Sequence, residues 1–133
     1  MVAMRNFSAA VALGLCVATG PVCAGTNSET GEALLRSCNY ALALESLGVT
    51  VEDMGKRFQA MHCIGYVQGV MDGYELGAWK ASTKLICLPE AGISVDQAIR
   101  IVVKHLNGNP EQLHMPARAI QVAALAKAFP CVR

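Results

Sequence analysis

Few residues of this sequence have the types and the spacing that catalysis requires. His62 stands next to Cys63 and could activate a thiolate nucleophile, but neighbouring side chains on a helix point about 100° apart. His105 and His114 lie much further along the chain, and no two histidines have the spacing of a helical zinc site. Asp72 is a lone carboxylate, which is more typical of a solvated or hydrogen-bonded helix residue than of a catalytic acid. We therefore expect no catalytic residue, no bound metal and no cofactor.

Glycine recurs at every fourth position of one stretch, at Gly65, Gly69, Gly73 and Gly77. No strand pattern precedes these glycines, so they do not form the phosphate-binding turn of a dinucleotide site. The apolar residues between them fall on one broad helical face: Tyr66, Val67, Val70, Met71 and Tyr74. This predicts a central, largely buried helix whose glycines let a second helix approach closely, from this chain or from a second subunit. The alternative is an irregular glycine-rich segment, which would avoid a cost of about 1 kcal/mol per helical glycine.

Residues 1–24 have the three parts of a cleavable signal peptide. A short basic start ends at Arg5, an apolar run extends over residues 7–20, and Val22-Cys23-Ala24 fits the site that a signal peptidase reads. We expect cleavage after Ala24, which leaves residues 25–133 as one exported domain. A retained membrane anchor is the weaker alternative because the apolar run is short for a bilayer span, and the residues before Cys23 are a poor context for lipidation.

The cysteines of the exported part indicate disulfides. Of six cysteines in 133 residues, signal cleavage leaves Cys38, Cys63, Cys87 and Cys131. An even number in a small exported chain predicts two disulfides, for which three connectivities exist. A cysteine metal site is the alternative, although the sequence has no Cys-x-x-Cys pair. The formal charge of the whole chain is only +1, and no basic patch indicates nucleic acid binding.

The hydrophobic pattern predicts four helices, over about residues 32–46, 50–80, 94–107 and 116–129, with one extra turn at 110–114. Ser94 and Gln97 form a capping box at the start of the third helix. The β-branched run at 101–103 would also allow a short strand, and the small polar residues 25–31 are expected to be an irregular start. The predicted fold is all-α, a small four- to five-helix antiparallel bundle with two disulfides.

The order of the helices favours one of the three disulfide connectivities. Cys38 precedes Thr50 by about as many residues as Cys63 follows it, so the two lie at similar heights in an antiparallel hairpin. Cys87 precedes the third helix and Cys131 follows the last, and the start of one antiparallel helix meets the end of the other. We predict Cys38–Cys63 and Cys87–Cys131. The other connectivities require a bundle that is wound differently.

Five motifs together give the sequence a family resemblance. They are Cys63-x-Gly65-Tyr66-x-x-Gly69-x-x-Asp72-Gly73, Cys87-Leu88-Pro89, Ile101-Val-Val-Lys104-x-Leu106, Asn109-Pro-Glu-x-Leu-His114-x-Pro-Ala117 and Ala123-Ala-Leu-Ala-x-Ala-Phe-Pro-Cys131. In this combination the chain resembles the Rap/Tai immunity proteins of type VI secretion, over about residues 38–131.

The resemblance implies an exported, disulfide-bonded helical protein that acts in the periplasm. Its implied partner is a cognate peptidoglycan amidase effector, whose active-site cleft it would block, and a homodimer is possible. The motifs do not identify the contact residues, so we select two loops as candidates, 82–93 and 107–115. We expect no nucleic acid partner and no stable membrane insertion after signal cleavage. The alternatives are an orphan or chaperone-like periplasmic binding protein and, less well supported, a small hydrolase.

Overall fold

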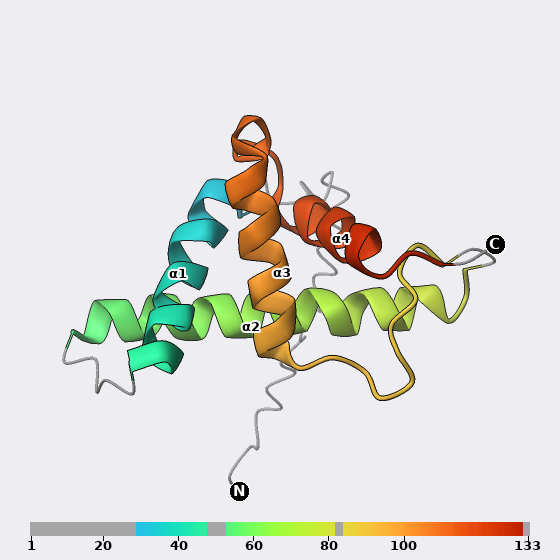
Figure 1. The fold of residues 1–133 in the computed structure, drawn as a ribbon, viewed down its shortest axis with the longest axis horizontal. Coiled ribbons are helices and arrows are strands. Elements are labelled where there is room, and N and C mark those ends of the chain that lie inside the picture. Colours follow the sequence, from blue (N-terminus) through green and yellow to red (C-terminus); the bar gives the residue numbers. More distant parts are fainter. Residues whose placement is uncertain (1–28, 48–52, 82–83, 132–133) are drawn as a thin grey trace, which may run out of the picture.

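The regular secondary structure of the residues that the structure describes is helical, apart from one isolated backbone bridge. The described residues are 29–47, 53–81 and 84–131 of a computed structural model (Figure 1). The elements are α1 (Gly31–Leu47), α2 (Met54–Ala78), α3 (Val95–Gly108), the single 3-10 turn η1 (Pro110–Gln112) and α4 (Ala117–Ala128). The predicted all-α fold is confirmed, and the β-branched run 101–103 belongs to α3. The expected signal peptide and Thr50 lie outside the described residues.

Local capping sets the starts of two helices. The Ser94 hydroxyl accepts a hydrogen bond from the backbone N–H of Gln97 at 3.1 Å, so α3 begins at the predicted capping box. At the start of α2 the Asp53 carboxylate accepts from the N–H of Gly55 at 2.8 Å. Helix α2 therefore begins a few residues later than the sequence pattern indicated, because Asp53 supplies the cap.

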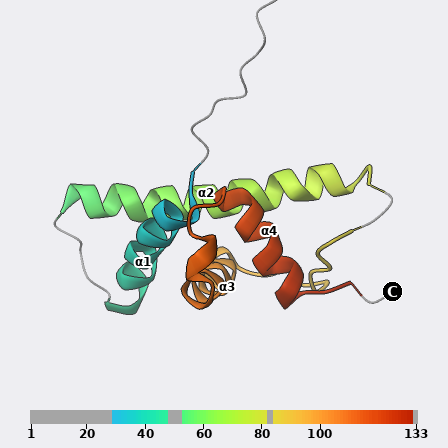
Figure 2. The same ribbon diagram turned by 90° about the horizontal axis from the view of Figure 1, so that it is seen from above.

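The other three helices all pack on one side of α2 (Figure 2). Helix α2 has 25 residues, and α1 and α3 cross it steeply while they run in opposite directions to each other (Figure 1). Helix α4 packs against α3. The largest fully buried side chains lie between these helices: Leu34, Leu106, Ile120, Leu125 and Gln121. The amide of Gln121 donates to the carbonyl of Val67 at 2.7 Å and so joins α4 to α2.

The opposite face of α2 is exposed, which corrects the expectation of a largely buried helix. Only Ala60, Cys63 and Val67 of α2 are buried. Within the described part of the chain, a Cβ added at any glycine of the row would meet no atom within 4 Å, at Gly65, Gly69, Gly73 or Gly77. The glycines therefore do not receive another of the described helices. The reason is geometric, because all three neighbouring helices occupy the side that carries the apolar residues between the glycines.

Both predicted disulfides are present. Cys38 is bonded to Cys63 and joins the middle of α1 to the middle of α2, with both residues fully buried. Cys87 is bonded to Cys131 and joins the segment before α3 to the segment after α4. The connectivity argued from helix order is therefore confirmed, although α1 crosses α2 steeply rather than lying along it (Figure 1).

Two segments far apart in the sequence, residues 29–32 and 113–117, form a backbone contact that we call the clasp. Ala117 N–H donates to the carbonyl of Glu29 at 2.7 Å, and Gly31 N–H donates to the carbonyl of Met115 at 3.0 Å. Thr30 and Pro116 form an isolated antiparallel bridge. The irregular start expected for residues 25–31 is thus wrong for residues 29–31, because these residues pair with the chain before α4.

We searched the described helices for a membrane span, and none of them combines the length and the apolar character that crossing a bilayer requires.

Candidate functional site

The residues that could carry out chemistry are not assembled into a catalytic site in the described ranges. Cys63 is held in a disulfide and cannot act as a thiolate. The His62 ring nitrogen lies 3.9 Å from a Glu29 carboxylate oxygen, whereas His105 lies 3.3 Å from the side-chain oxygen of Gln112. No group of three metal-binding side chains occurs among the described residues.

Tyr66 lies next to His62 on α2 and behaves as a neutral packing residue. Burial raises the pKa of the Tyr66 phenol above its usual value, and the charge of Glu29 raises it further. Arg118 partly opposes this rise. The centroids of the His62 and Tyr66 rings are 6.0 Å apart, in a tilted arrangement. A phenol whose pKa is raised is a poorer nucleophile or base at neutral pH, so this cluster is suited to packing and not to catalysis.

The segment 84–93 is exposed at its tip and firmly held at its base. The backbone N–H groups of Leu85 and Ile86 both donate to the Tyr74 hydroxyl, at 2.8 and 2.9 Å. Cys87 is fixed by its disulfide and by a backbone hydrogen bond of 3.0 Å to the carbonyl of Phe129. Gly92, at φ 70°, closes a turn over residues 89–92. This segment therefore presents a surface that is already ordered before any partner binds.

Tyr74→Phe is expected to loosen this segment. The change removes the hydroxyl that accepts from the Leu85 and Ile86 amides. Ile86 is buried, and an unpaired N–H at a buried position costs about 1–3 kcal/mol. Hydrogen exchange followed by NMR should show faster exchange of these two amides, by about tenfold or more. Tyr40→Phe, a matched change on α1, should leave both amides unchanged. Equal exchange in the Tyr74 variant and the unmodified protein would contradict this role of the hydroxyl.

Apolar side chains surround the base of segment 84–93. Trp79, directly after α2, is 89% exposed, and Leu85 is 60% exposed. Beside them lies an open hollow of about 320 Å³, whose lining includes Tyr74, Trp79 and Lys84. We call segment 84–93 with this hollow the loop surface. It offers an apolar contact area with one anion, Glu75, and one cation, Lys84, at its margin, which is a composition suited to binding a protein.

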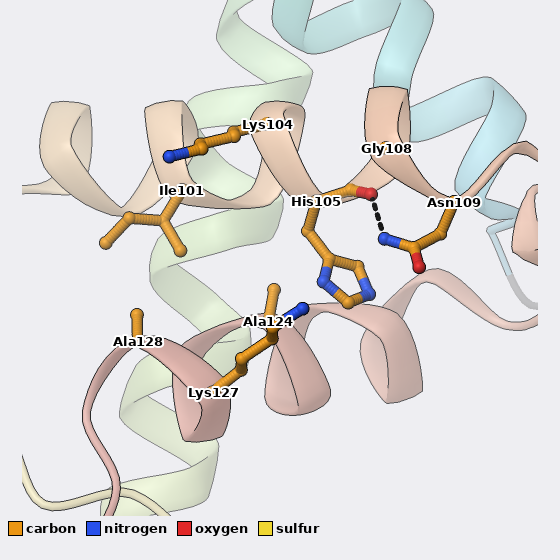
Figure 3. A pocket seen from close by; sticks show the side chains of 8 residues that line it. All are labelled: Ile101, Lys104, His105, Gly108, Asn109, Ala124, Lys127 and Ala128. Atoms are coloured by element: carbon orange, nitrogen blue, oxygen red, sulfur yellow. Dashed lines mark hydrogen bonds between the residues drawn. The ribbon is translucent and has the colours of Figure 1, made fainter.

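The second candidate loop, 107–115, is folded back onto its own helices. The Asn109 side chain donates to the carbonyl of His105 at 2.6 Å, and the loop then enters the clasp. A groove of about 410 Å³ lies between α3 and α4 (Figure 3). His105 points from α3 towards α4, and Lys127 extends towards it from α4, so the groove has a basic side and an apolar floor (Figure 3). This loop offers less exposed apolar area than the loop surface.

Sequence reasoning missed two features of the site. The sequence placed Tyr74 on the apolar face of its helix, and only the fold reveals that its hydroxyl holds segment 84–93. The large exposed side chains at the end of α2 were not singled out either. Their signal was available, because Leu76 and Trp79 lie opposite the apolar face that the sequence predicts for this helix.

A comparison with known protein families tests the resemblance that the five sequence motifs indicated. The family model described as Rap1a immunity proteins matches residues 30–131, a range that holds the four helices and all four disulfide-bonded cysteines. The resemblance recognised from those motifs is therefore confirmed. No curated protein and no solved structure matches the chain in the corresponding searches.

Proposed function

Since this chain belongs to the family of Rap1a immunity proteins, we propose that it neutralises a peptidoglycan amidase delivered by type VI secretion. The family consists of immunity proteins and not of enzymes, and it implies immunity against a type VI effector. Blocking an active-site cleft requires a complementary surface but no cofactor and no catalytic residue. The family match over residues 30–131 is the observation that carries this proposal.

We place this activity in the periplasm, after removal of residues 1–24 as a signal peptide. Two disulfides support this location, because disulfides form and persist in oxidising compartments and are rare in the cytosol. Peptidoglycan also lies outside the inner membrane, so an inhibitor of its hydrolysis has to be there. A homodimer is part of the proposal, in line with the family resemblance.

The loop surface is the part of the chain that we propose enters the effector cleft. Its support is physical: segment 84–93 is exposed at the tip and held by Tyr74 and the Cys87–Cys131 disulfide. A segment that is ordered before binding loses less conformational entropy when it binds. Loop 107–115 is the comparison surface, because its hydrogen bonds direct it back onto α3 and into the clasp.

The test is inhibition of peptidoglycan cleavage by a secreted amidase from the same cell. Leu85→Asp places a charge in the apolar part of the loop surface and should weaken inhibition by about tenfold or more. Met115→Asp makes the same change at an exposed residue of loop 107–115 and should leave inhibition unchanged. The reverse pattern would assign binding to loop 107–115. Failure of the unmodified protein to bind or inhibit any such amidase would refute the amidase proposal.

One observation favours a second candidate function, a chaperone-like protein without an amidase partner. Helix α2 exposes large apolar side chains, which chaperones use to hold unfolded chains. A chaperone should suppress the aggregation of unrelated unfolded proteins, whereas an immunity protein should not. An amidase effector encoded next to this protein would further favour immunity.

A further inference from the structure

A hollow of about 460 Å³ lies between the start of α1 and the first half of α2, and it shares no lining residue with the loop surface. Its lining includes an anion, a cation, an amide and an aromatic ring: Glu29, Arg36, Gln59 and Phe58. Clefts of about 300–1,000 Å³ with apolar walls and a few polar groups are typical of small-molecule sites. We propose that this α1–α2 hollow binds an α-amino acid head group, in which an ammonium and a carboxylate group are bonded to one carbon atom.

The two charged residues of the hollow have opposite signs but do not neutralise each other. Glu29 lies directly before α1 in the clasp, and Arg36 lies on the second turn of α1. In the described ranges no carboxylate forms an ion pair with Arg36, neither Glu29 nor Glu32 one helical turn before it. The hollow therefore presents a positive and a negative group that are held apart. A ligand that carries both charges is electrostatically complementary to it.

The Glu29 carboxylate is partly buried without a close partner. Its side chain is 23% exposed, and one carboxylate oxygen lies 3.9 Å from a ring nitrogen of His62, which is too long for a hydrogen bond. No group in the described part of the chain donates a hydrogen bond to this carboxylate. Removing a charge from water costs free energy unless hydrogen bonds and an opposite charge compensate for it. A ligand ammonium group would supply both, because it has three N–H donors and a positive charge.

Arg36 and Gln59 supply donors for the ligand carboxylate. The hydroxyl of the buried Ser37 lies 2.7 Å from the side-chain oxygen of Gln59 and so fixes the amide. This contact leaves the amide N–H groups of Gln59 available on the lining of the hollow. The guanidinium group of Arg36 is always charged and can donate two parallel hydrogen bonds to one carboxylate. The ligand carboxylate would therefore bind at Arg36 and Gln59, and the ligand ammonium at Glu29.

Two sources of this head group reach an exported protein, a free amino acid and a peptidoglycan stem peptide. In the stem peptide the head group ends the side chain of a diaminopimelate residue. Phe58 is 70% exposed and lines the hollow, so its ring offers an apolar surface for the methylene groups of that side chain. The stem peptide as source rests on the proposed function at the cell wall, whereas the site itself does not. Binding to the wall would concentrate the protein where an incoming amidase acts.

The first experiment measures the binding of soluble probes by calorimetry. The tripeptide of L-alanine, D-glutamate and meso-diaminopimelate should bind with a Kd below about 1 mM. The same tripeptide with L-lysine in place of diaminopimelate lacks only the side-chain carboxylate. It should bind about tenfold more weakly or worse, because Arg36 and Gln59 lose their acceptor. Free L-alanine distinguishes the two sources: alanine that binds as tightly as the first tripeptide assigns the site to a free amino acid, and weaker binding assigns it to the stem peptide.

The second experiment tests the two charged residues. Arg36→Gln and Glu29→Gln should each weaken binding of the diaminopimelate tripeptide by about tenfold or more, because each removes one charged partner of the head group. Lys127→Gln also removes one charge, but in the groove between α3 and α4, and should leave binding unchanged. Thermal unfolding checks that the variants are folded. Glu29→Gln keeps the backbone carbonyl that Glu29 contributes to the clasp.

Three results would each overturn the proposal. The first is equal binding of the diaminopimelate and lysine tripeptides, and the second is no binding of any probe at about 10 mM. The third is unchanged binding in both Arg36→Gln and Glu29→Gln. Amidase inhibition by the unmodified protein, measured on the same preparation, reports separately on the proposed function, because the loop surface and the α1–α2 hollow have no residue in common.

Discussion

Replacing Cys38 and Cys63 together with alanine is expected to lower the free energy of unfolding by at least about 3.5 kcal/mol. The disulfide closes a loop with a sequence separation of 25 residues, and a loop of this length loses about that much chain entropy in the unfolded state. Both cysteines are also fully buried, so the variant loses apolar contacts in the core. Small domains have total stabilities of about 5–15 kcal/mol, so this loss is large.

Urea unfolding followed by circular dichroism measures this change. The matched control replaces Cys87 and Cys131, whose separation of 44 residues gives about 4 kcal/mol from loop closure. Cys87 is exposed, so little packing is lost there in addition. A reducing agent should bring the unmodified protein close to the sum of both losses. A Cys38/Cys63 variant as stable as the unmodified protein would show that α1 and α2 are held by packing alone.

Gly31→Ala is the second change with a large expected effect. A Cβ at this position would lie 2.5 Å from the Ile120 terminal methyl and 3.0 Å from a Leu106 methyl. It would also lie 3.2 Å from the backbone carbonyl oxygen of Leu113, which cannot rotate away. Overpacking of this kind in a core costs about 1–3 kcal/mol, so we expect a corresponding loss of stability.

Gly73→Ala is the matched control for Gly31→Ala. Its Cβ would meet no described atom within 4 Å, so helix propensity should stabilise the protein by up to about 1 kcal/mol. The two variants therefore carry the same chemical change with opposite expected signs. Thermal unfolding of both variants and of the unmodified protein measures the two changes in stability. A stabilising effect of Gly31→Ala would mean that the start of α1 is not packed against Ile120 and Leu106.

The parts of the fold that sequence reasoning predicted depend on local signals. The Ser94 cap and the apolar spacing of α3 are encoded within a few residues, and both are found where expected. The disulfide pairing could also be predicted, because the order of the helices along the chain favoured one of the three connectivities. Residues on the apolar face of α2, such as Val67, are indeed directed to the core.

The parts that were missed depend on contacts between distant segments. The side chains of residues 29–31 give no sequence signal for pairing with residues 113–117. The contact is made by backbone groups, and these are the same at every position. For a related reason, the sequence left open which helix the glycine row receives. Sequence spacing shows that Gly65 and Gly69 share a side of the helix, but not whether a helix of this chain or one of another chain lies there. Likewise, the contact between Tyr74 and segment 84–93 depends on the path of the chain in three dimensions, which the sequence pattern does not show.

The clasp has a consequence for the order in which an exported chain can fold. Residues 29–32 have their backbone partners at 113–117, and Cys87 has its partner at Cys131. If the chain crosses the membrane from its N-terminus, as the proposed signal peptide requires, the early helices emerge before these partners. Translocation would therefore be nearly complete before the native structure can close. The backbone contacts of residues 29–32 and the Cys87–Cys131 disulfide therefore form only after the C-terminal part of the chain has emerged.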